Sequence, residues 1–254
     1  MSHWWPVVTR LGVVSIVLAA GLAGCGSGPV GQPSGETFPT LPVGAVLPSG
    51  QDCAVRVVRG HPEEVPDNAK ANATVPDKVV MPVWEDFTEE ANQRYVSRID
   101  GNFTGTTGEI LQWGACKWGL DVSVLRAVAY QESDWKQATS DDPSEDPADC
   151  AVTGLPVPCP TSFGMLQLKS VDLPGSYPWS LTSTAFNVDY YGARMRSCYE
   201  GWVTYLGGDY GSGDLFDCVG WHWSGMWKDA GALNYVSRVR NYLGQQPWQR
   251  FDRS

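Results

Sequence analysis

Hydrophobic residues recur at helical spacing over most of the second half of the chain. Leu125 and Val128 lie three positions apart after Asp121, a residue type that favours the N-cap of a helix. The same spacing predicts further helices over three ranges: 185–200, 214–223 and 234–244. The pattern therefore indicates a mainly α-helical protein.

The first half of the chain is less regular. One helix is predicted over 84–99, because Phe87, Ala91, Tyr95 and Ile99 follow at four-residue intervals. Residues 53–57 are interpreted as a short strand or extended segment, and the prolines within 61–80 predict irregular structure there. A chain of this length can bury one substantial core. We expect one helical domain over 110–250, with an irregular N-terminal extension, 51–109, packed on it.

An apolar run from Leu11 to Leu22 follows one basic residue, Arg10. As a helix it would be about 18 Å long, which is short for a hydrocarbon core of roughly 30 Å but typical of a signal sequence. The run ends in Leu22-Ala23-Gly24-Cys25, which resembles the bacterial lipobox. The alternative is an ordinary signal peptide with an incidental Cys25.

The lipobox interpretation predicts where the mature protein resides. Residues 1–24 would be removed as a lipoprotein signal peptide, and Cys25 would be lipidated and become the first residue. Residues 26–50 are rich in Gly, Pro, Ser and Thr, and predict a flexible linker with a root-mean-square span of about 28 Å. We therefore expect an exported protein, anchored by lipid to the outer face of the cytoplasmic membrane and facing the cell wall.

Charge excludes two classes of partner. The 254 residues carry 18 Lys and Arg against 28 Asp and Glu, a net charge of −10, and removal of Arg10 with the signal peptide changes this to −11. Nucleic acids are bound by clustered basic residues, so no nucleic-acid partner is expected. The same balance opposes adhesion to anionic lipids, so membrane contact is expected through the lipid anchor only. We expect a monomer.

Six cysteines remain once Cys25 is set aside, and an even number in an exported chain indicates three disulfides. Six cysteines allow fifteen pairings, and the sequence does not choose among them. We favour Cys150–Cys159, which closes a short Pro-rich loop, and Cys198–Cys218, which leaves Cys53–Cys116. The sequence has no Cys-x-x-Cys pair and its three histidines do not cluster, so neither a metal nor a cofactor is expected.

One carboxylate occupies an apolar stripe. Leu125, Val128 and Glu132 are spaced i, i+3, i+7, which places them on one helix face, and Trp135 continues the stripe if the helix extends that far. Burial raises the pKa of a glutamate, and a neutral carboxyl can donate a proton, as cleavage of a glycosidic bond requires. The alternative is that Glu132 ends the helix and points into water.

Five short blocks around this glutamate carry a family resemblance. In chain order they are Gln131-Glu132-Ser133-Asp134-Trp135, Ser162-Phe163-Gly164-Met165-Leu166-Gln167, 187–191, 220–225, and Tyr235-Val236 with Val239. Together they resemble the motifs of soluble lytic transglycosylases and goose-type lysozymes over roughly residues 110–245. The resemblance implies a lysozyme-like domain that cuts the β-1,4 bond between N-acetylmuramic acid and N-acetylglucosamine in peptidoglycan glycan strands. It also implies one catalytic glutamate and 1,6-anhydro products.

Carried over residue by residue, the resemblance makes Glu132 the catalytic residue. It implies that the substrate groove is lined by Gln167, Met165, Ser162, Tyr190, Trp221 and Tyr235. Tyr191 is the alternative to Tyr190, since either may follow the motif's asparagine, Asn187. Packing in the core is the alternative role for Met165 and for the tyrosines, because these residue types commonly fill cores.

The sequence departs from the family pattern in three places. Met165 and Leu166 are transposed relative to the common order, and Trp221 and His222 replace the usual Tyr and Asn. The histidine puts the family's usual hydrogen bond to the catalytic carboxylate in doubt. An acidic loop is also inserted between Glu132 and Gly164, and it contains Asp141, Asp142, Glu145, Asp146 and Asp149. We expect a solvated surface loop, with a cation site or a lid as alternatives.

Two other functions remain open. A hydrolase of the same fold would need a second carboxylate to direct water, for which Asp134 and residues 141–149 are candidates. A non-catalytic peptidoglycan-binding lipoprotein would keep the groove and lack the activity, a hypothesis motivated by Trp221 and His222. The chain has no Gly-x-Ser-x-Gly, no His-Glu-x-x-His and no phosphate-binding glycine loop, which disfavours other enzyme classes.

Overall fold

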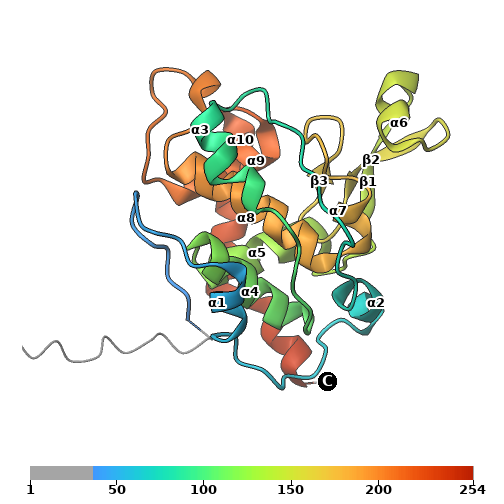
Figure 1. Ribbon diagram of the computed structural model, residues 1–254, viewed down its shortest axis with the longest axis vertical. Coiled ribbons are helices and arrows are strands. Elements are labelled where there is room, and N and C mark those ends of the chain that lie inside the picture. The colour runs from blue at the N-terminus through green and yellow to red at the C-terminus, as the bar shows by residue number, and fades with distance from the viewer. Residues whose placement is uncertain (1–36, 254) are drawn as a thin grey trace, which may run out of the picture. The chain divides into compact units, whose positions relative to one another are not determined.

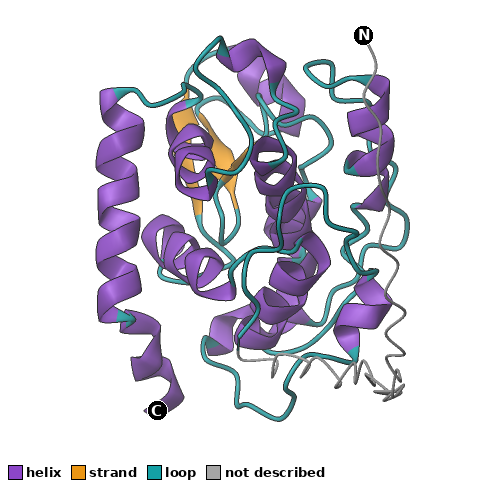
Figure 2. Ribbon diagram, turned by 90° about the vertical axis from the view of Figure 1, so that its left-hand side faces the viewer, coloured by secondary structure: helices purple, strands orange, loops and turns teal. Residues whose placement is uncertain are grey.

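Helices dominate residues 37–253, the part of the chain that the computed structural model describes (Figures 1 and 2). The α-helices are α1 Gly50–Ala54, α2 Ala69–Asn72, α3 Glu89–Arg94, α4 Thr107–Trp118, α5 Val122–Ser133, α6 Pro147–Thr153, α7 Trp179–Thr182, α8 Thr184–Tyr199, α9 Leu215–Ser224 and α10 Ala230–Gln245. The 3-10 helices are η1 Pro66–Asn68, η2 Val96–Arg98, η3 Thr204–Leu206 and η4 Pro247–Arg253. The prediction of a mainly helical protein is confirmed.

The predicted signal peptide and the lipobox cysteine, Cys25, lie outside the described residues, so both stay predictions. Within residues 37–253, no helix combines the length and the apolar character that a membrane span needs.

The centre of the helical packing is α8, which contacts α4, α7 and α9. Its crossing with α4 is close because both helices carry glycine there. A Cβ at Gly114 would lie 2.2 Å from the Val188 side chain, and one at Gly192 would lie 2.2 Å from the Trp118 ring. Neither distance is compatible with a side chain at those positions. The helix α10, which leads to the C-terminal end in Figure 2, packs against α9 and α5.

A buried ion pair also joins α4 to α8. The Lys117 ammonium lies 2.8 Å from Asp189, and both side chains are almost fully buried. Asp189 additionally accepts hydrogen bonds from the Trp118 indole at 2.7 Å and from the Gly101 backbone N–H at 2.9 Å. A buried charge is tolerated when it is paired and hydrogen-bonded in this way, and removal of either partner would leave the other uncompensated.

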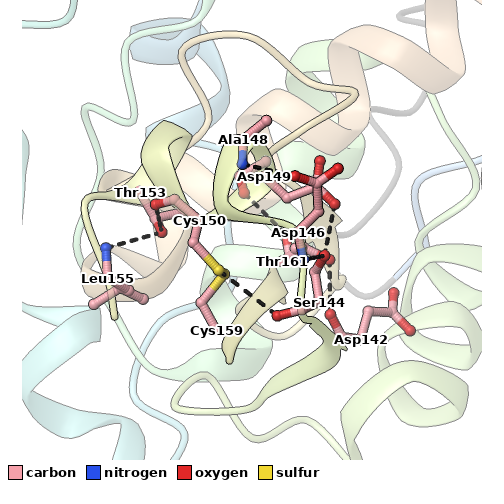
Figure 3. Close-up of a disulfide and its surroundings, with 11 residues drawn as sticks. Asp142, Ser144, Asp146, Ala148, Asp149, Cys150, Thr153, Leu155, Cys159 and Thr161 are labelled. Atoms are coloured by element: carbon pink, nitrogen blue, oxygen red, sulfur yellow. Dashed lines mark hydrogen bonds between the residues drawn. A yellow bond between two sulfur atoms is a disulfide. The ribbon is translucent and has the colours of Figure 1, made fainter. Parts of the chain in front are cut away.

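A small antiparallel sheet completes the fold, with strands β1 Ser140–Ser144, β2 Cys159–Phe163 and β3 Leu168–Lys169 in that order. Residue Ser140 pairs with Phe163, and Ser162 pairs with Lys169. The α6 segment is inserted between β1 and β2, and the Cys150–Cys159 disulfide ties it to β2 (Figure 3). The inserted acidic loop is therefore a hairpin with its own helix and covalent closure.

All three favoured disulfide pairings are confirmed. The Cys53–Cys116 bond joins α1 to α4, and Cys198–Cys218 joins α8 to α9. The six sulfur-bearing side chains are buried. Each bond therefore links two elements that pack together in the core or, in the hairpin, closes a loop of nine residues.

The helices predicted in the second half are confirmed. Asp121 caps α5 by accepting hydrogen bonds from Ser123 N at 2.7 Å and Val124 N at 3.4 Å. The predictions over 185–200 and 214–223 correspond to α8 and α9. Helix α10 begins four residues before the predicted start, because Asp229 caps it by accepting from Ala232 N at 2.7 Å.

The helix predicted over 84–99 is wrong for its first part. Only Glu89–Arg94 is α-helical, followed by the 3-10 turn of η2. The Asn92 side chain bonds both the N–H and the carbonyl of Trp84, at 2.8 and 3.0 Å, and so holds residues 84–87 in a turn. Asparagine side chains compete with helical backbone hydrogen bonds in this manner.

Two predictions near the N-terminus are also corrected. The expected strand or extended segment at 53–57 is wrong, because Ser49 and Asp52 form a capping box that starts α1. The flexible linker does not extend to residue 50, since Phe38 is buried and Leu41 N donates to Gly119 O at 3.0 Å. Residues from 37 onward are therefore part of the folded unit.

Candidate active site

The last turn of α5 carries Glu132. Leu125 and Val128, on the same face, are buried in the core. The helix ends at Ser133, and Asp134 and Trp135 both have left-handed backbone angles, with φ of 52° and 65°. Trp135 therefore leaves the stripe, and its indole turns back to donate to Arg126 O at 2.9 Å.

The half-buried Glu132 side chain lies in a cavity of about 670 Å³. Besides α5, the small sheet, the turn before β3 and α9 contribute to the walls of this cavity. Residues from these elements that line it include Asp141, Asp142, Ser162, Gln167, His222 and Trp223. The acidic hairpin therefore forms one wall of the glutamate's cavity, in addition to being a surface loop.

Tyr235 on α10 donates a short hydrogen bond to Glu132 Oε1. Burial raises the pKa of Glu132 from 4.5 to about 7, against the opposing effect of the Tyr235 hydrogen bond. The negative charge of Asp142 raises this pKa further, and the Arg238 guanidinium lowers it. A carboxyl with this pKa holds a proton at neutral pH in a substantial fraction of molecules, and can both donate and accept one.

The raised pKa makes the free energy of unfolding depend on pH. The folded protein keeps a proton on Glu132 that the unfolded chain releases above pH 4.5. This group therefore destabilises the fold increasingly as pH rises from 4.5 through about 7. We expect Glu132→Gln to stabilise the protein at pH 8 by up to roughly 3 kcal/mol and to leave it unchanged at pH 4. Urea unfolding at both pH values tests this, and an equal change at the two pH values would contradict it.

The turn Gly164–Gln167 is fixed from three sides. The Ser133 hydroxyl donates to Met165 O at 2.8 Å, Gln137 Oε1 accepts from Met165 N at 3.1 Å, and Asn187 Oδ1 accepts from Leu166 N at 2.9 Å. Gly164 has a φ of 83°, and a Cβ there would lie 2.1 Å from Ser180 O, so the position requires glycine. This framework places the Gln167 side chain at the cavity.

A second carboxylate faces the same cavity. Asp142 on β1 accepts a hydrogen bond from the Ser162 hydroxyl at 2.5 Å, and its carbonyl accepts from Thr161 Oγ1 at 2.8 Å. Figure 3 shows its carboxyl turned away from the Cys150–Cys159 disulfide. The charge of Asp142 raises the pKa of Glu132, so the two carboxyl groups interact electrostatically.

Unusual backbone conformations cluster around this cavity. Of the six non-glycine residues with positive φ among the described residues, Asp142 and Gln167 line the cavity and Asp134 and Trp135 follow Glu132 directly. Such conformations cost of order 1–3 kcal/mol each and persist where the surrounding structure imposes them, often at functional sites.

A second cavity of about 470 Å³ continues the first, since Gln167, Lys169, His222 and Trp223 line both. The Trp223 side chain is 52% exposed. Its ring is stacked over Tyr235, with ring centroids 6.0 Å apart and an interplanar angle of 16°. The two cavities form a groove, called the α9 groove below, with an exposed aromatic face beside the glutamate.

The histidine that departs from the family pattern does not bond Glu132. Burial lowers the pKa of His222 to about 3, helped by the Arg194 charge, so its ring is neutral. The ring bonds the Leu166 backbone and contacts Tyr191 edge-to-face at 4.7 Å. Tyr235 is therefore the hydrogen-bond donor to the glutamate, and His222 supports the 164–167 turn.

Of the other predicted groove residues, some line a cavity and others pack in the core. Gln167 and Ser162 line the first cavity, and Trp221 lines the second. Met165 is fully buried, so its side chain packs in the core and only its backbone shapes the turn. Tyr190 packs against Trp84 and donates to Pro174 O at 3.1 Å, whereas the buried Tyr191 is the tyrosine close enough for its pKa to respond to Glu132.

Two positioning residues had no motif to identify them in the sequence. Gln137 lies outside the five blocks but bonds the Met165 N–H and the Ser180 carbonyl. Asp142 is one of several acids in the hairpin, and it is distinguished by the hydrogen bond from Ser162 and by its effect on the pKa of Glu132. No cluster of three or more His, Cys, Asp or Glu residues within 37–253 is arranged to hold a metal ion.

Comparison of the chain with protein-family models, with curated proteins and with solved structures finds no match. The site is therefore interpreted from its own geometry.

Proposed function

We propose that the protein is a lytic transglycosylase that cuts peptidoglycan glycan strands, with Glu132 as its only catalytic acid and base. The observation that carries the proposal is a half-buried glutamate with a pKa of about 7 in an open groove. The mainly helical fold with a small sheet is compatible with a lysozyme-like domain, and the five motif blocks favour one. The exposed face of Trp223 offers a surface on which a sugar ring can stack.

The proposed reaction needs one proton donor and no external water. Protonated Glu132 donates to the oxygen that links N-acetylmuramic acid to N-acetylglucosamine, and the bond from muramyl C1 to that oxygen breaks. The substrate's 2-acetamido group stabilises the positive charge at C1. The ionised Glu132 then accepts the proton of the muramyl C6 hydroxyl, whose oxygen attacks C1 and forms the 1,6-anhydro ring. The glutamate ends the cycle protonated, because the proton that it accepts from the C6 hydroxyl replaces the one that it gave to the leaving oxygen.

Hydrolysis in the same groove is the second candidate, and one observation favours it. Asp142 lines the same cavity as Glu132 and its charge acts on the glutamate, and an inverting hydrolase needs a second carboxylate to activate water. The Ser162 hydrogen bond keeps this carboxylate oriented. A muramidase that uses Glu132 as acid and Asp142 as base would release a reducing end that contains one added water.

The Asp142→Asn variant separates these two reactions. Under the proposal, cleavage persists and the product keeps its anhydro end, since asparagine still accepts the Ser162 hydrogen bond. The alkaline limb of the pH–rate profile moves to lower pH, because the charge that raises the pKa of Glu132 is gone. Mass spectrometry of the products and a pH–rate profile measure both effects. A loss of about 100-fold or more, with a water-added product from the wild type, would identify the hydrolase instead.

A non-catalytic protein that binds glycan would give a third result. Wild-type protein would then sediment with insoluble cell wall without releasing soluble fragments. That outcome would contradict the proposal while leaving the groove as a binding site.

A further inference from the structure

The guanidinium of Arg194 lies beside the α9 groove without a hydrogen-bonding partner. Arg194 belongs to α8, and its Nε is shielded from solvent and bonds no described residue. No carboxylate within residues 37–253 forms an ion pair with it. Its only close neighbours of defined geometry are the rings of Trp221, at 4.4 Å, and Trp84, at 5.9 Å. Stacking on aromatic rings holds a guanidinium in place but leaves its N–H donors unused.

A second arginine on the same helix shows what a structural guanidinium looks like here. Arg196 is fully buried, and it donates to the carbonyls of Leu41, Pro42 and Gly119 at 2.7–3.0 Å. It also bonds Glu200 through two nitrogens. Arg196 therefore satisfies the rule that buried polar groups are hydrogen-bonded, whereas Arg194, two residues earlier, does not.

Arg194 faces open space that is continuous with the groove. It lines the second cavity of the α9 groove, together with Trp221 and Tyr205, and it also lines an adjoining cavity of about 390 Å³. The Trp221 indole donates to the Tyr205 hydroxyl at 3.0 Å, which fixes this aromatic wall. A ligand in the groove at Glu132 can therefore reach the guanidinium past Gln167 and Trp223.

We propose that Arg194 binds a carboxylate on the substituent of the muramyl residue, in a subsite next to the cleavage position. The proposal rests on the proposed function, because it takes the groove's ligand to be a peptidoglycan strand. Such strands carry a lactyl group on each muramyl ring, which ends in a free carboxylate or in a stem peptide with carboxylates of its own. A planar guanidinium matches a carboxylate through two parallel hydrogen bonds.

The charges around the subsite favour a single carboxylate. Asp86 and Asp172 lie near enough to raise the pKa of Arg194, whereas burial lowers it. Asp172 is itself 3.5 Å from the Lys169 ammonium. Two acidic and two basic side chains thus line the second cavity, and their charges balance. An anion is therefore attracted only close to the guanidinium. The two aspartates repel a polyanion more strongly than a single carboxylate, whose charge one guanidinium can balance.

The test compares carboxylates with amides on the substrate. Four strand preparations are needed: strands with stem peptides, strands stripped of peptide by an amidase, and each of these after carbodiimide conversion of carboxylates to amides. For the wild type, we expect amidation to raise KM by about 10-fold or more, the usual effect of losing a charged hydrogen bond. An effect in the peptide-bearing pair identifies the stem peptide as the source, and an effect only in the stripped pair identifies the lactyl group. No effect in either pair would overturn the proposal.

Variants link the effect to this residue. With Arg194→Gln, KM should no longer distinguish carboxylate from amide strands. Arg94 is a matched control, because it is also half-buried and lies over an aromatic ring, that of Tyr95, but lines neither cavity of the groove. Arg94→Gln should keep the wild-type difference. A difference that persists in Arg194→Gln would contradict the proposal. If that variant does not fold, Arg194→Lys serves in its place and should lose most of the difference, since lysine lacks the planar fork.

Binding separates this proposal from the proposed function. Two soluble probes, N-acetylmuramic acid with its free lactyl carboxylate and muramyl dipeptide with its peptide carboxylate, can each be titrated in carboxylate and amidated form against the wild type and both arginine variants, with tryptophan fluorescence as the readout. Tighter binding of the carboxylate form that depends on Arg194 would support the subsite even if no strand were cleaved. Equal binding of the carboxylate and amidated forms of both probes by the wild type would overturn it even if strands were cleaved.

Discussion

Replacing Glu132 by glutamine should abolish the release of soluble fragments from peptidoglycan. Glutamine keeps the shape of the side chain and can still accept the Tyr235 hydrogen bond, but it has no proton to donate to the leaving oxygen. Since general acid catalysis contributes 10²- to 10⁴-fold, the rate should fall by about 1,000-fold. Zymography on cell-wall material and a turbidity assay measure the loss.

The neighbouring Asp134 provides the control. Its side chain is exposed, it pairs at 3.8 Å with Lys136, and it lines neither cavity of the groove. Asp134→Asn should therefore cut glycan at the wild-type rate. A clearing zone of undiminished size for Glu132→Gln would show that Glu132 is not the catalytic acid. Loss of activity in Asp134→Asn would indicate that Asp134 has this role instead.

Removing the Cys53–Cys116 disulfide should cost more stability than removing either of the other two disulfides. The bond spans 63 residues, and loss of a cross-link over that length releases unfolded-chain entropy worth about 4 kcal/mol. Both sulfurs are buried between α1 and α4, so the double variant Cys53→Ala, Cys116→Ala also loses packing. Thermal and urea unfolding under oxidising conditions measure the loss.

The hairpin disulfide is the comparison for this second result. Cys150–Cys159 spans nine residues, so its removal should cost only about 2.5 kcal/mol. Because the hairpin forms a wall of the cavity, the effect of this change on activity is more informative than its effect on stability. Asp142 and Ser162 lie on the strands that this bond closes, so activity should fall more than global stability does. Equal stability losses in the two double variants would contradict the dependence on loop length.

The helices that the sequence predicts well are those with their own start signals. Asp121, Asp214 and Asp229 each cap a helix through a backbone N–H, and the apolar spacing that follows is continuous. The 84–99 segment has the same spacing, but Asn92 bonds the backbone of Trp84 and holds a turn that no periodicity reveals. The end of the predicted linker is ordered for a similar reason, because the carbonyls of Leu41 and Pro42 accept hydrogen bonds from Arg196, more than 150 residues away.

The candidate site, like the fold, could be predicted from the sequence only in part. A glutamate on an apolar stripe could be found from spacing alone, and the order of the motif blocks pointed to Gln167 and Tyr235. The choice between Tyr190 and Tyr191 could not be made, because adjacent residues of a buried helix face different neighbours. Asp142 gains its importance from its place in the cavity of Glu132, and Arg194 from the absence of a partner. Neither property is visible in the sequence.

If the chain is anchored to a membrane at Cys25, the docking of residues 38–42 against α4 and α8 limits how far from that membrane the groove can reach. If Cys25 is the lipidated residue, only twelve peptide units separate it from Thr37, the first residue of the described unit. Even a fully extended chain of that length covers no more than about 42 Å. Under the proposed function, the groove would then reach only glycan strands that lie close to the bilayer surface.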